Sequence, residues 1–142
     1  MTDRDEQIAR ICSEHEGLEG PLLPILHAVQ AAFGCVDAEA ERAIARALNL
    51  SRAEVHGVVS FYHDFTVAPD PRPRIDICRA EACQARGIDA MISAAQAAAG
   101  DRVRLGTVYC LGLCSAGPSA RVGDRLYARL DEAALVTLVH AL

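Results

Sequence analysis

Four of the six cysteines in this 142-residue chain form two close pairs, and their spacing carries the clearest chemistry in the sequence. Cys78 and Cys83 form a C-x4-C pair in CRAEAC, and Cys110 and Cys114 form a C-x3-C pair in CLGLC. Paired thiols can bind a metal, close a disulfide or pack as small apolar side chains. The C-x-x-C spacing of a thioredoxin-type dithiol is absent. Four cysteines in two pairs favour a metal site.

The elements that must position these cysteines lie after residue 73. The predicted elements are a strand over 74–78, a helix over 80–100 with a break at Gly87, strands over 102–108, 119–122 and 125–128, and a final helix after Asp131. A strand–helix–strand unit followed by a hairpin and a covering helix is typical of the thioredoxin-like arrangement. Its first two strands are parallel, and the hairpin completes a four-stranded mixed sheet.

This order of strands should bring four sulfur atoms to one edge of the sheet. Cys78 ends the first strand and Cys110 closes the second, and neighbouring parallel strands end at the same edge. Four thiolates are the usual ligands of a 2Fe–2S cluster, and they also suit a structural zinc ion. The sequence therefore predicts one site with ligands Cys78, Cys83, Cys110 and Cys114.

The ligand spacing favours a 2Fe–2S cluster over zinc. Zinc sites usually hold the two ligands of a pair roughly two to four positions apart around a tight turn. Here Cys78 and Cys83 are five positions apart, and a whole helix separates the two pairs. Cys83 is expected in the first turn of a helix, where backbone N–H groups favour a thiolate. Gly112 and Gly117 would let the backbone approach a cluster sulfide closely and donate hydrogen bonds to it. A zinc-stapled interaction module and a free-standing ferredoxin stay open as alternatives.

The first half of the chain predicts four short helices before residue 64. The signals are Thr2 or Asp3 before the first helix, Gly34 after the second, Asp37 before and Asn49 after the third, and a Ser51–Glu54 capping box at the fourth. Ala47 and Tyr62 are expected on buried stripes of the last two helices. Cys12 and Cys35 are expected to be structural.

Prolines at 69, 71 and 73 predict an extended connector that divides the chain. The fold class is α/β (α+β), with a helical bundle over 1–68, a proline-rich linker over 69–73 and a thioredoxin-like domain over 74–142. The charge also divides: residues 1–72 hold 6 Arg and 12 acidic residues, whereas residues 73–142 hold 8 Arg and 7 acidic residues. The acidic half, including Glu39 and Glu41, is expected to dock a larger partner.

Composition excludes several classes of function. No strongly basic face for nucleic acid is expected, and no apolar run approaches the length of a membrane-spanning helix. The acidic start MTDRDEQ is unlike a signal peptide, so we expect a reducing, cytoplasmic location where structural disulfides are rare. His56 and His63, seven positions apart, are expected to pack on a surface or interface. No nucleophile, phosphate loop or paired carboxylates indicate a substrate site.

With these residues in view, the chain resembles the family of the 24 kDa, E-type subunit of NADH-quinone oxidoreductases. CRAEACQ, YCLGLCSAGP and EVHGVVSFYHDF over 54–65 carry the resemblance, which extends from Pro21 to the final helix. It implies a thioredoxin-like 2Fe–2S ferredoxin fold behind a small helical bundle. It also implies one 2Fe–2S cluster on Cys78, Cys83, Cys110 and Cys114, with no catalytic residue of the chain's own.

Within that family the chain looks most like the gamma subunit of NAD-dependent, molybdenum-containing formate dehydrogenases. The respiratory subunit and the NAD-linked hydrogenase subunit are the near alternatives. The resemblance implies electron transfer beside a flavin- and NAD-binding beta-type subunit, together with a larger molybdenum- and iron–sulfur-containing subunit. FMN, NAD and the molybdenum cofactor would belong to those partners, where FMN exchanges hydride with NAD.

Overall fold

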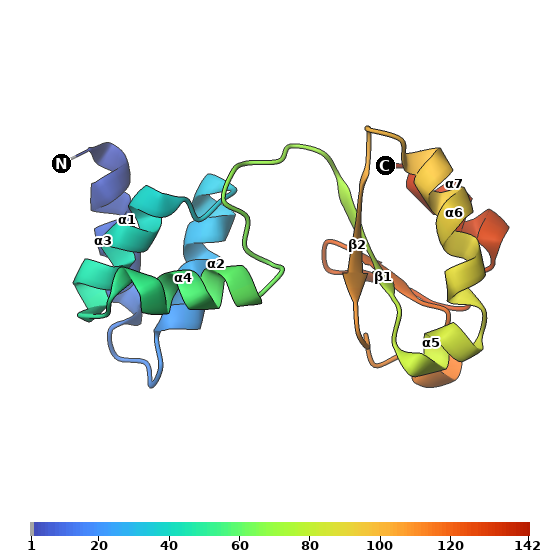
Figure 1. The fold of residues 1–142 in the computed structure, drawn as a ribbon, viewed down its shortest axis with the longest axis horizontal. Helices are drawn as coiled ribbons and strands as arrows, with labels where there is room; N and C mark the ends of the chain where they lie inside the picture. Colours follow the sequence, from blue (N-terminus) through green and yellow to red (C-terminus); the bar gives the residue numbers. More distant parts are fainter. Residues whose placement is uncertain (1) are drawn as a thin grey trace. The chain divides into compact units, whose positions relative to one another are not determined.

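The computed structural model describes residues 2–142, which divide into two compact units, one up to Asp70 and one from Pro71 to Leu142. Both units are drawn in Figure 1, and each is described by itself. The boundary between them falls inside the predicted proline-rich connector. The division into separate domains over 1–68 and 74–142 stays a prediction. No helix in the described part of the chain is long and apolar enough to cross a membrane.

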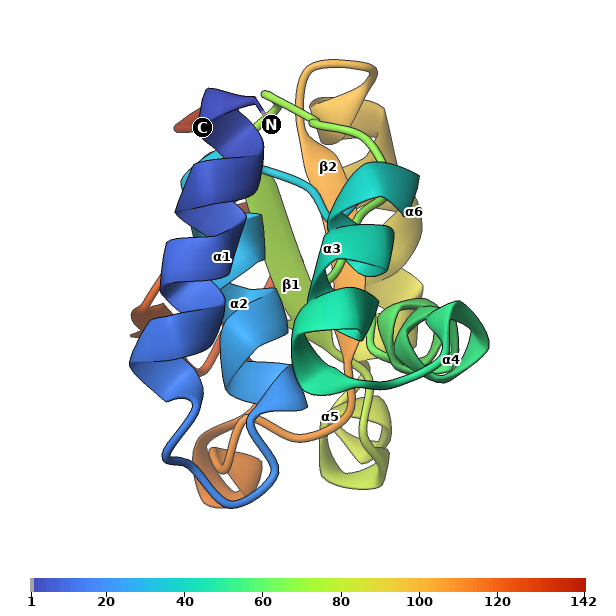
Figure 2. The same cartoon turned by 90° about the vertical axis from the view of Figure 1, so that its left-hand side faces the viewer.

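The first unit is built from helices that begin and end at the residues the sequence indicates. They are α1 (Asp3–His15), α2 (Leu22–Phe33), α3 (Ala38–Leu48) and α4 (Arg52–Phe61). Thr2 and Ser51 form capping boxes, the Asp37 side chain accepts the Ala40 N–H, and Asn49 is left-handed with φ 54°. In Figure 2, α1, α2 and α3 run side by side, while α4 is seen end-on and crosses them. Their buried apolar side chains form one core.

Two expected core positions of the first unit are wrong. Ala47 is exposed because α3 buries Ala40, Glu41, Ile44 and Ala45, so its inward face is rotated from the expected stripe. Tyr62 is 41% exposed because it lies beyond α4 as the capping residue. Its backbone is extended there, so helical spacing no longer determines where its side chain points.

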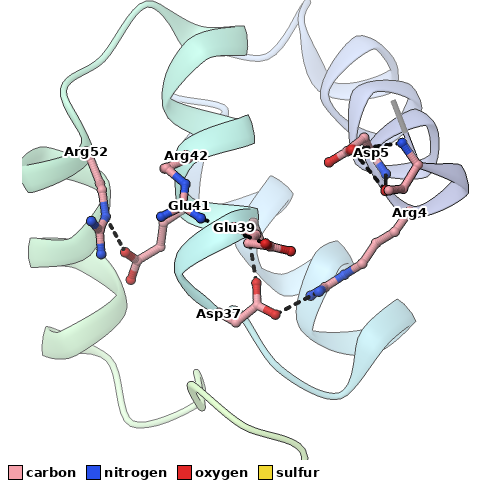
Figure 3. Close-up of polar contacts among 9 residues, drawn as sticks. Arg4, Asp5, Asp37, Glu39, Glu41, Arg42 and Arg52 are labelled. Carbon is pink, nitrogen blue, oxygen red and sulfur yellow. Dashed lines mark hydrogen bonds and ion pairs between the residues drawn. The ribbon is translucent and has the colours of Figure 1, made fainter.

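Glu41 is a buried carboxylate of the first unit, with only 2% exposure. Its Oε2 accepts a hydrogen bond from Arg52 Nε at 3.5 Å, and its Oε1 lies 2.8 Å from His56 Nδ1. Figure 3 shows the contact with Arg52 and a second ion pair, in which Arg4 donates to Asp37 at 2.7 Å. A buried charge requires such partners. Glu41 is therefore part of the structure of this unit rather than a free docking charge, which corrects that part of the sequence-based expectation.

The second unit contains a four-stranded mixed sheet in the order β2-β1-β3-β4. Its strands are β1 (Arg74–Cys78), β2 (Arg104–Val108), β3 (Ala120–Val122) and β4 (Arg125–Tyr127), and its helices are α5 (Glu81–Ala85), α6 (Ile88–Ala99), α7 (Glu132–His140) and the 3₁₀ turn η1 (Cys114–Ala116). β1 runs parallel to β2 and antiparallel to β3. The predicted break is confirmed, because Gly87 has φ 91° between α5 and α6.

Two isoleucines at alternate positions of β1 point into the core of this unit. Ile75 and Ile77 are fully buried with Ala120, and they belong to one cluster with residues of α6 and α7. Figure 1 shows α6 and α7 on the same face of the sheet. The packed core fixes the strand register, in which Cys78 pairs with Val108. The loops that follow β1 and β2 therefore leave the same edge.

Candidate metal centre

The four predicted ligands lie in the two segments that leave this edge of the sheet. Cys78 is the last residue of β1, and Cys83 lies in α5, the short helix that follows. Cys110 comes two residues after the end of β2, and Cys114 begins η1. All four are free thiols. The prediction that parallel strands place the two pairs at one edge is confirmed by this topology.

The pair in CLGLC is exposed and held in an uncommon backbone conformation. The Sγ atoms of Cys110 and Cys114 are 3.6 Å apart, and the Gly112 N–H donates to Cys110 Sγ at 3.3 Å. Cys110 itself has φ 88°, a left-handed conformation that is rare for a residue other than glycine. Such strain persists where the surroundings enforce it, and it concentrates at functional sites. The backbone of this loop therefore adopts an uncommon conformation in which its two sulfur atoms lie close together.

The pair in CRAEAC is buried, with both Cys78 and Cys83 at 2% exposure. Burial favours the neutral thiol of Cys78, but hydrogen bonds from the backbone N–H groups of Ala80, Cys110 and Leu111, and from the Cys83 thiol, outweigh it. The pKa of Cys78 is therefore lower than that of an ordinary cysteine. Donors from both cysteine loops converge on one buried sulfur, which favours the thiolate that a metal requires.

Gly117 and Ser119 complete the environment of Cys83. A Cβ added at Gly117 would lie 3.0 Å from Cys83 Sγ, so only glycine fits there without moving the sulfur. Ser119 is buried, and its Oγ lies 3.7 Å from the same sulfur. The Gly117–Pro118 peptide bond is cis. The backbone thus lies close to a cysteine sulfur at Gly117, and the Gly112 N–H reaches another, while the approach of both to a cluster sulfide stays a prediction.

Charges of both cysteine pairs act on the Cys114 thiol. A hydrogen bond with Cys110 and the negative charge of that thiolate raise the pKa of Cys114, with further contributions from the charges of Cys83 and Cys78. Across the described residues, no three Cys, His, Asp or Glu side chains gather closely enough to hold a single metal ion. That the four cysteines form one site stays a prediction, which these pairwise contacts support. Four mutually repelling thiolates need a cationic centre to ionise together, and the iron of a 2Fe–2S cluster suits that donor set.

The remaining cysteines and histidines lie outside this arrangement. Cys12 and Cys35 are buried in the first unit, and burial raises the pKa of the Cys12 thiol. His56 is oriented by Glu41 rather than by a second histidine. Sequence reasoning missed Ser119 and the backbone donors at Ala80 and Leu111. A backbone N–H leaves no signal in the residue type, and Ser119 follows the second pair without any motif of its own.

The family comparison matches residues 8–142 to the thioredoxin-like [2Fe-2S] ferredoxins. The chain belongs to this family. The predicted fold, a helical segment followed by a thioredoxin-like ferredoxin domain with a four-stranded mixed sheet, is confirmed. The cofactor of this ferredoxin is one 2Fe–2S cluster. The zinc-stapled module is the weaker interpretation of the same four cysteines.

Two curated relatives and a solved structure show the kind of protein in which this ferredoxin fold occurs. The chain is 33% identical over 118 residues to NADP-reducing hydrogenase subunit HndA of Solidesulfovibrio fructosivorans, covering 77% of this chain and 69% of that protein. It is 27% identical over 150 residues to an E-type NADH-quinone oxidoreductase subunit of Rhizobium meliloti (strain 1021), covering 99% and 89%. It also matches a chain of an NAD+-reducing [NiFe]-hydrogenase in the H2-reduced state, with a TM-score of 0.65 and 28% identity over 80% of this chain.

These similarities place the ferredoxin among the subunits of oxidoreductases. The chain spans only 21% of the solved hydrogenase chain, so it corresponds to one part of that larger protein. None of the three is named as a formate dehydrogenase, and the assignment to that enzyme stays a prediction.

Proposed function

We propose that the chain is an electron-transfer subunit of a cytoplasmic NAD-dependent formate dehydrogenase complex, with one 2Fe–2S cluster held by Cys78, Cys83, Cys110 and Cys114. A bound 2Fe–2S cluster supplies the reversible uptake of one electron. The observation that carries the proposal is the parallel pairing of β1 with β2, which brings the CRAEAC and CLGLC segments out at the same edge of the sheet. We assign the flavin, NAD and the molybdenum cofactor to partner subunits, as the family resemblance implies.

The residues of the site divide the work of holding and shielding the sulfur atoms. Cys78 and Cys83 bind from the protein interior, where backbone N–H groups stabilise the thiolate charge. Cys110 and Cys114 bind from the surface, and the Gly112 N–H orients Cys110 Sγ. The half-buried Leu111 packs against the apolar cluster of this unit and would shield the cluster from water. Hydrogen bonding and restricted water access are the means by which a protein sets a cluster's potential.

The exposed pair supports exchange of electrons with another protein. Tyr109, directly before Cys110, is 75% exposed, the largest exposed fraction among the large apolar side chains described. Aromatic residues are enriched at the centres of protein interfaces. A partner that covers Tyr109 would bring its redox group next to the exposed sulfur atoms. The flavin- and NAD-binding beta-type subunit is the partner we assign to this edge.

Different observations favour two candidate complexes, a formate dehydrogenase and an NAD(P)-linked hydrogenase. The motifs CRAEACQ and VHGVVSFYHDF favour formate dehydrogenase, in which a larger molybdenum- and iron–sulfur-containing subunit completes the assembly. The 33% identity to the subunit HndA favours an NAD(P)-linked hydrogenase. In both complexes the chain performs one-electron transfer next to a nicotinamide-linked subunit.

The cofactor proposal is tested on the purified chain. Aerobically purified protein should be red-brown, should bleach with dithionite, and should contain about two iron and two acid-labile sulfide per chain. A colourless chain that binds one zinc ion would instead establish the interaction-module alternative.

The choice of complex is tested in the source cell. The tagged chain should co-purify with a flavoprotein and a molybdenum-containing subunit, and the isolated complex should reduce NAD with formate. Nickel in place of molybdenum, with hydrogen-dependent NAD(P) reduction, would assign the chain to a hydrogenase. The metal, molybdenum or nickel, and the electron donor, formate or hydrogen, therefore distinguish the two complexes.

A further inference from the structure

Arg86 joins the two segments that carry the cysteines, although no motif singles it out. It follows Cys83 by three residues at the end of α5, so its side chain leaves the helix near that cysteine. Its Nη2 donates to the backbone carbonyl of Ser115 at 3.3 Å, in the turn that begins with Cys114. Its Cδ also lies 3.4 Å from the point that a Gly117 Cβ would occupy. One side chain therefore spans from the first cysteine pair to the second.

The turn that Arg86 contacts is otherwise tied by backbone hydrogen bonds. The Arg129 N–H donates to the Ala116 carbonyl at 2.7 Å, and the Leu130 N–H donates to the Pro118 carbonyl at 3.0 Å. These bonds hold the turn against the segment before α7. The Arg86 bond instead holds it against α5. Without Arg86 the turn would keep its fold but lose a direct tie to the helix of Cys83.

The charge of Arg86 also distinguishes it from the other arginine near Cys78. Arg79 is paired with Asp89 at 3.0 Å, so its charge is offset. Arg86 binds a neutral carbonyl instead, and the segment from Arg102 to Gly123, which contains Cys110 and Cys114, has no Asp or Glu. Glu81, in the first turn of α5, is the acidic residue of that helix. The guanidinium of Arg86 thus places a positive charge between the helix of Cys83 and the turn of Cys114.

We propose that Arg86 is a positioning residue that holds the Cys83 helix to the Cys114 turn and whose charge favours the more negative, reduced state of the site. The inference rests on the four-cysteine site proposed above. A positive charge stabilises an added electron through Coulomb attraction, so its removal should make the reduction potential more negative. Loss of the tie should also let the two cysteine pairs separate more readily.

The test compares Arg86→Gln and Arg86→Lys with the wild-type cluster-loaded chain. Potentiometric titration followed by EPR should show a more negative midpoint potential for Arg86→Gln and a nearly wild-type potential for Arg86→Lys. With a chelator present, the visible absorbance should decay several-fold faster in Arg86→Gln. Arg125→Gln is the matched control: Arg125 lies over the Tyr127 ring in the hairpin, and its loss should change neither quantity.

The outcomes separate this inference from the proposed function. If Arg86→Gln keeps the wild-type potential and decay rate, the role of Arg86 is refuted while the cluster stands. An equal potential shift in Arg125→Gln would also refute it, because the effect would then be one of net charge. Circular dichroism verifies the fold, and Arg86→Lys supplies a charge-retaining variant if Arg86→Gln is unstable. A wild-type chain without a cluster would instead overturn the proposed function.

Discussion

Cys12 of the first unit and Cys78 of the second are similarly buried, at 6% and 2% exposure. The pKa values of their thiols are nevertheless shifted in opposite directions. Burial raises the pKa of Cys12. Burial acts in the same direction on Cys78, but the N–H groups of Ala80, Cys110 and Leu111 outweigh it and lower the pKa. The comparison shows that two thiols with similar burial can have pKa values shifted in opposite directions, because the hydrogen-bond donors around the sulfur decide the direction. The helical unit uses its polar groups for caps and ion pairs, whereas the ferredoxin unit directs backbone donors at thiols.

The largest expected effect comes from replacing one cysteine in each unit. Cys78→Ser should abolish or strongly alter the visible and EPR spectra, because it removes the ligand on which both loops converge. Cys12→Ala should leave both spectra intact, at a cost in stability of roughly 1–2 kcal/mol for a lost buried sulfur. Iron and sulfide analysis of both variants measures the difference. Full cluster content in Cys78→Ser would contradict the ligand assignment.

A smaller effect is expected from adding one methyl group in each unit. Gly117→Ala would place its Cβ 3.0 Å from Cys83 Sγ, and Gly117 has an ordinary φ of −72°, so the effect is steric and not a backbone effect. We expect a shifted spectrum and lower cluster content, measured after reconstitution. Gly57→Ala in α4 meets nothing within 4 Å. It should keep the spectrum and stabilise the helix by roughly 0.5–1 kcal/mol, as seen in urea unfolding. Identical spectra for both variants would show that Gly117 does not restrict the sulfur.

The sequence predicts those features that depend on neighbouring residues. The cap at Thr2, the capping box at Ser51, the left-handed Asn49 and the break at Gly87 each follow from a residue type at a fixed offset. The convergence of the cysteine loops also follows, because two parallel strands end at one edge. The family resemblance adds the cluster to this arrangement.

What the sequence does not reveal depends on contacts between distant segments. Glu41 is buried because Arg52 and His56 of the next helix neutralise and hydrogen-bond it, and its own helix pattern marks it as a surface residue. Glu39, on the same helix, remains exposed, with Arg42 4.0 Å away. Arg86 and Ser119 meet the cysteine site through backbone geometry that is set only when both loops are folded.

Replacing Glu41 or Glu39 should affect only the stability of the first unit, with an effect of intermediate size. Glu41→Gln removes a buried charge from its hydrogen bonds and should lower the free energy of unfolding by about 1–3 kcal/mol. Glu39→Gln should change it by less than about 0.5 kcal/mol. Urea unfolding measures both, and the cluster spectrum should be the same in each. Equal stability of the two variants would mean that the Glu41 contacts do not stabilise the fold.

The smallest expected change in stability comes from replacing an aspartate helix cap, and each unit has one such cap. Asp37 caps α3 and binds Arg4, while Asp131 caps α7 through the Ala134 N–H and has no ion pair among the described residues. The hydrogen bond from Arg4, together with its charge and the Ala40 N–H, holds the pKa of Asp37 below its usual value. A lowered carboxyl pKa stabilises the fold above about pH 4, and this contribution is lost as the pH falls through the folded-state pKa.

Asparagine keeps the cap and removes the charge, so Asp37→Asn isolates the ion pair from the cap. We expect Asp37→Asn to lower stability by less than about 1 kcal/mol at neutral pH, with the difference from wild type shrinking in acid. Asp131 has no ion pair among the described residues, so Asp131→Asn should lower stability by less than Asp37→Asn does at neutral pH. Hydrogen exchange of the amides in α3 and α7, measured at neutral and acidic pH, reports each helix separately. A loss in Asp37→Asn that persists undiminished in acid would mean that the Arg4 pair contributes nothing and that asparagine is simply the poorer cap.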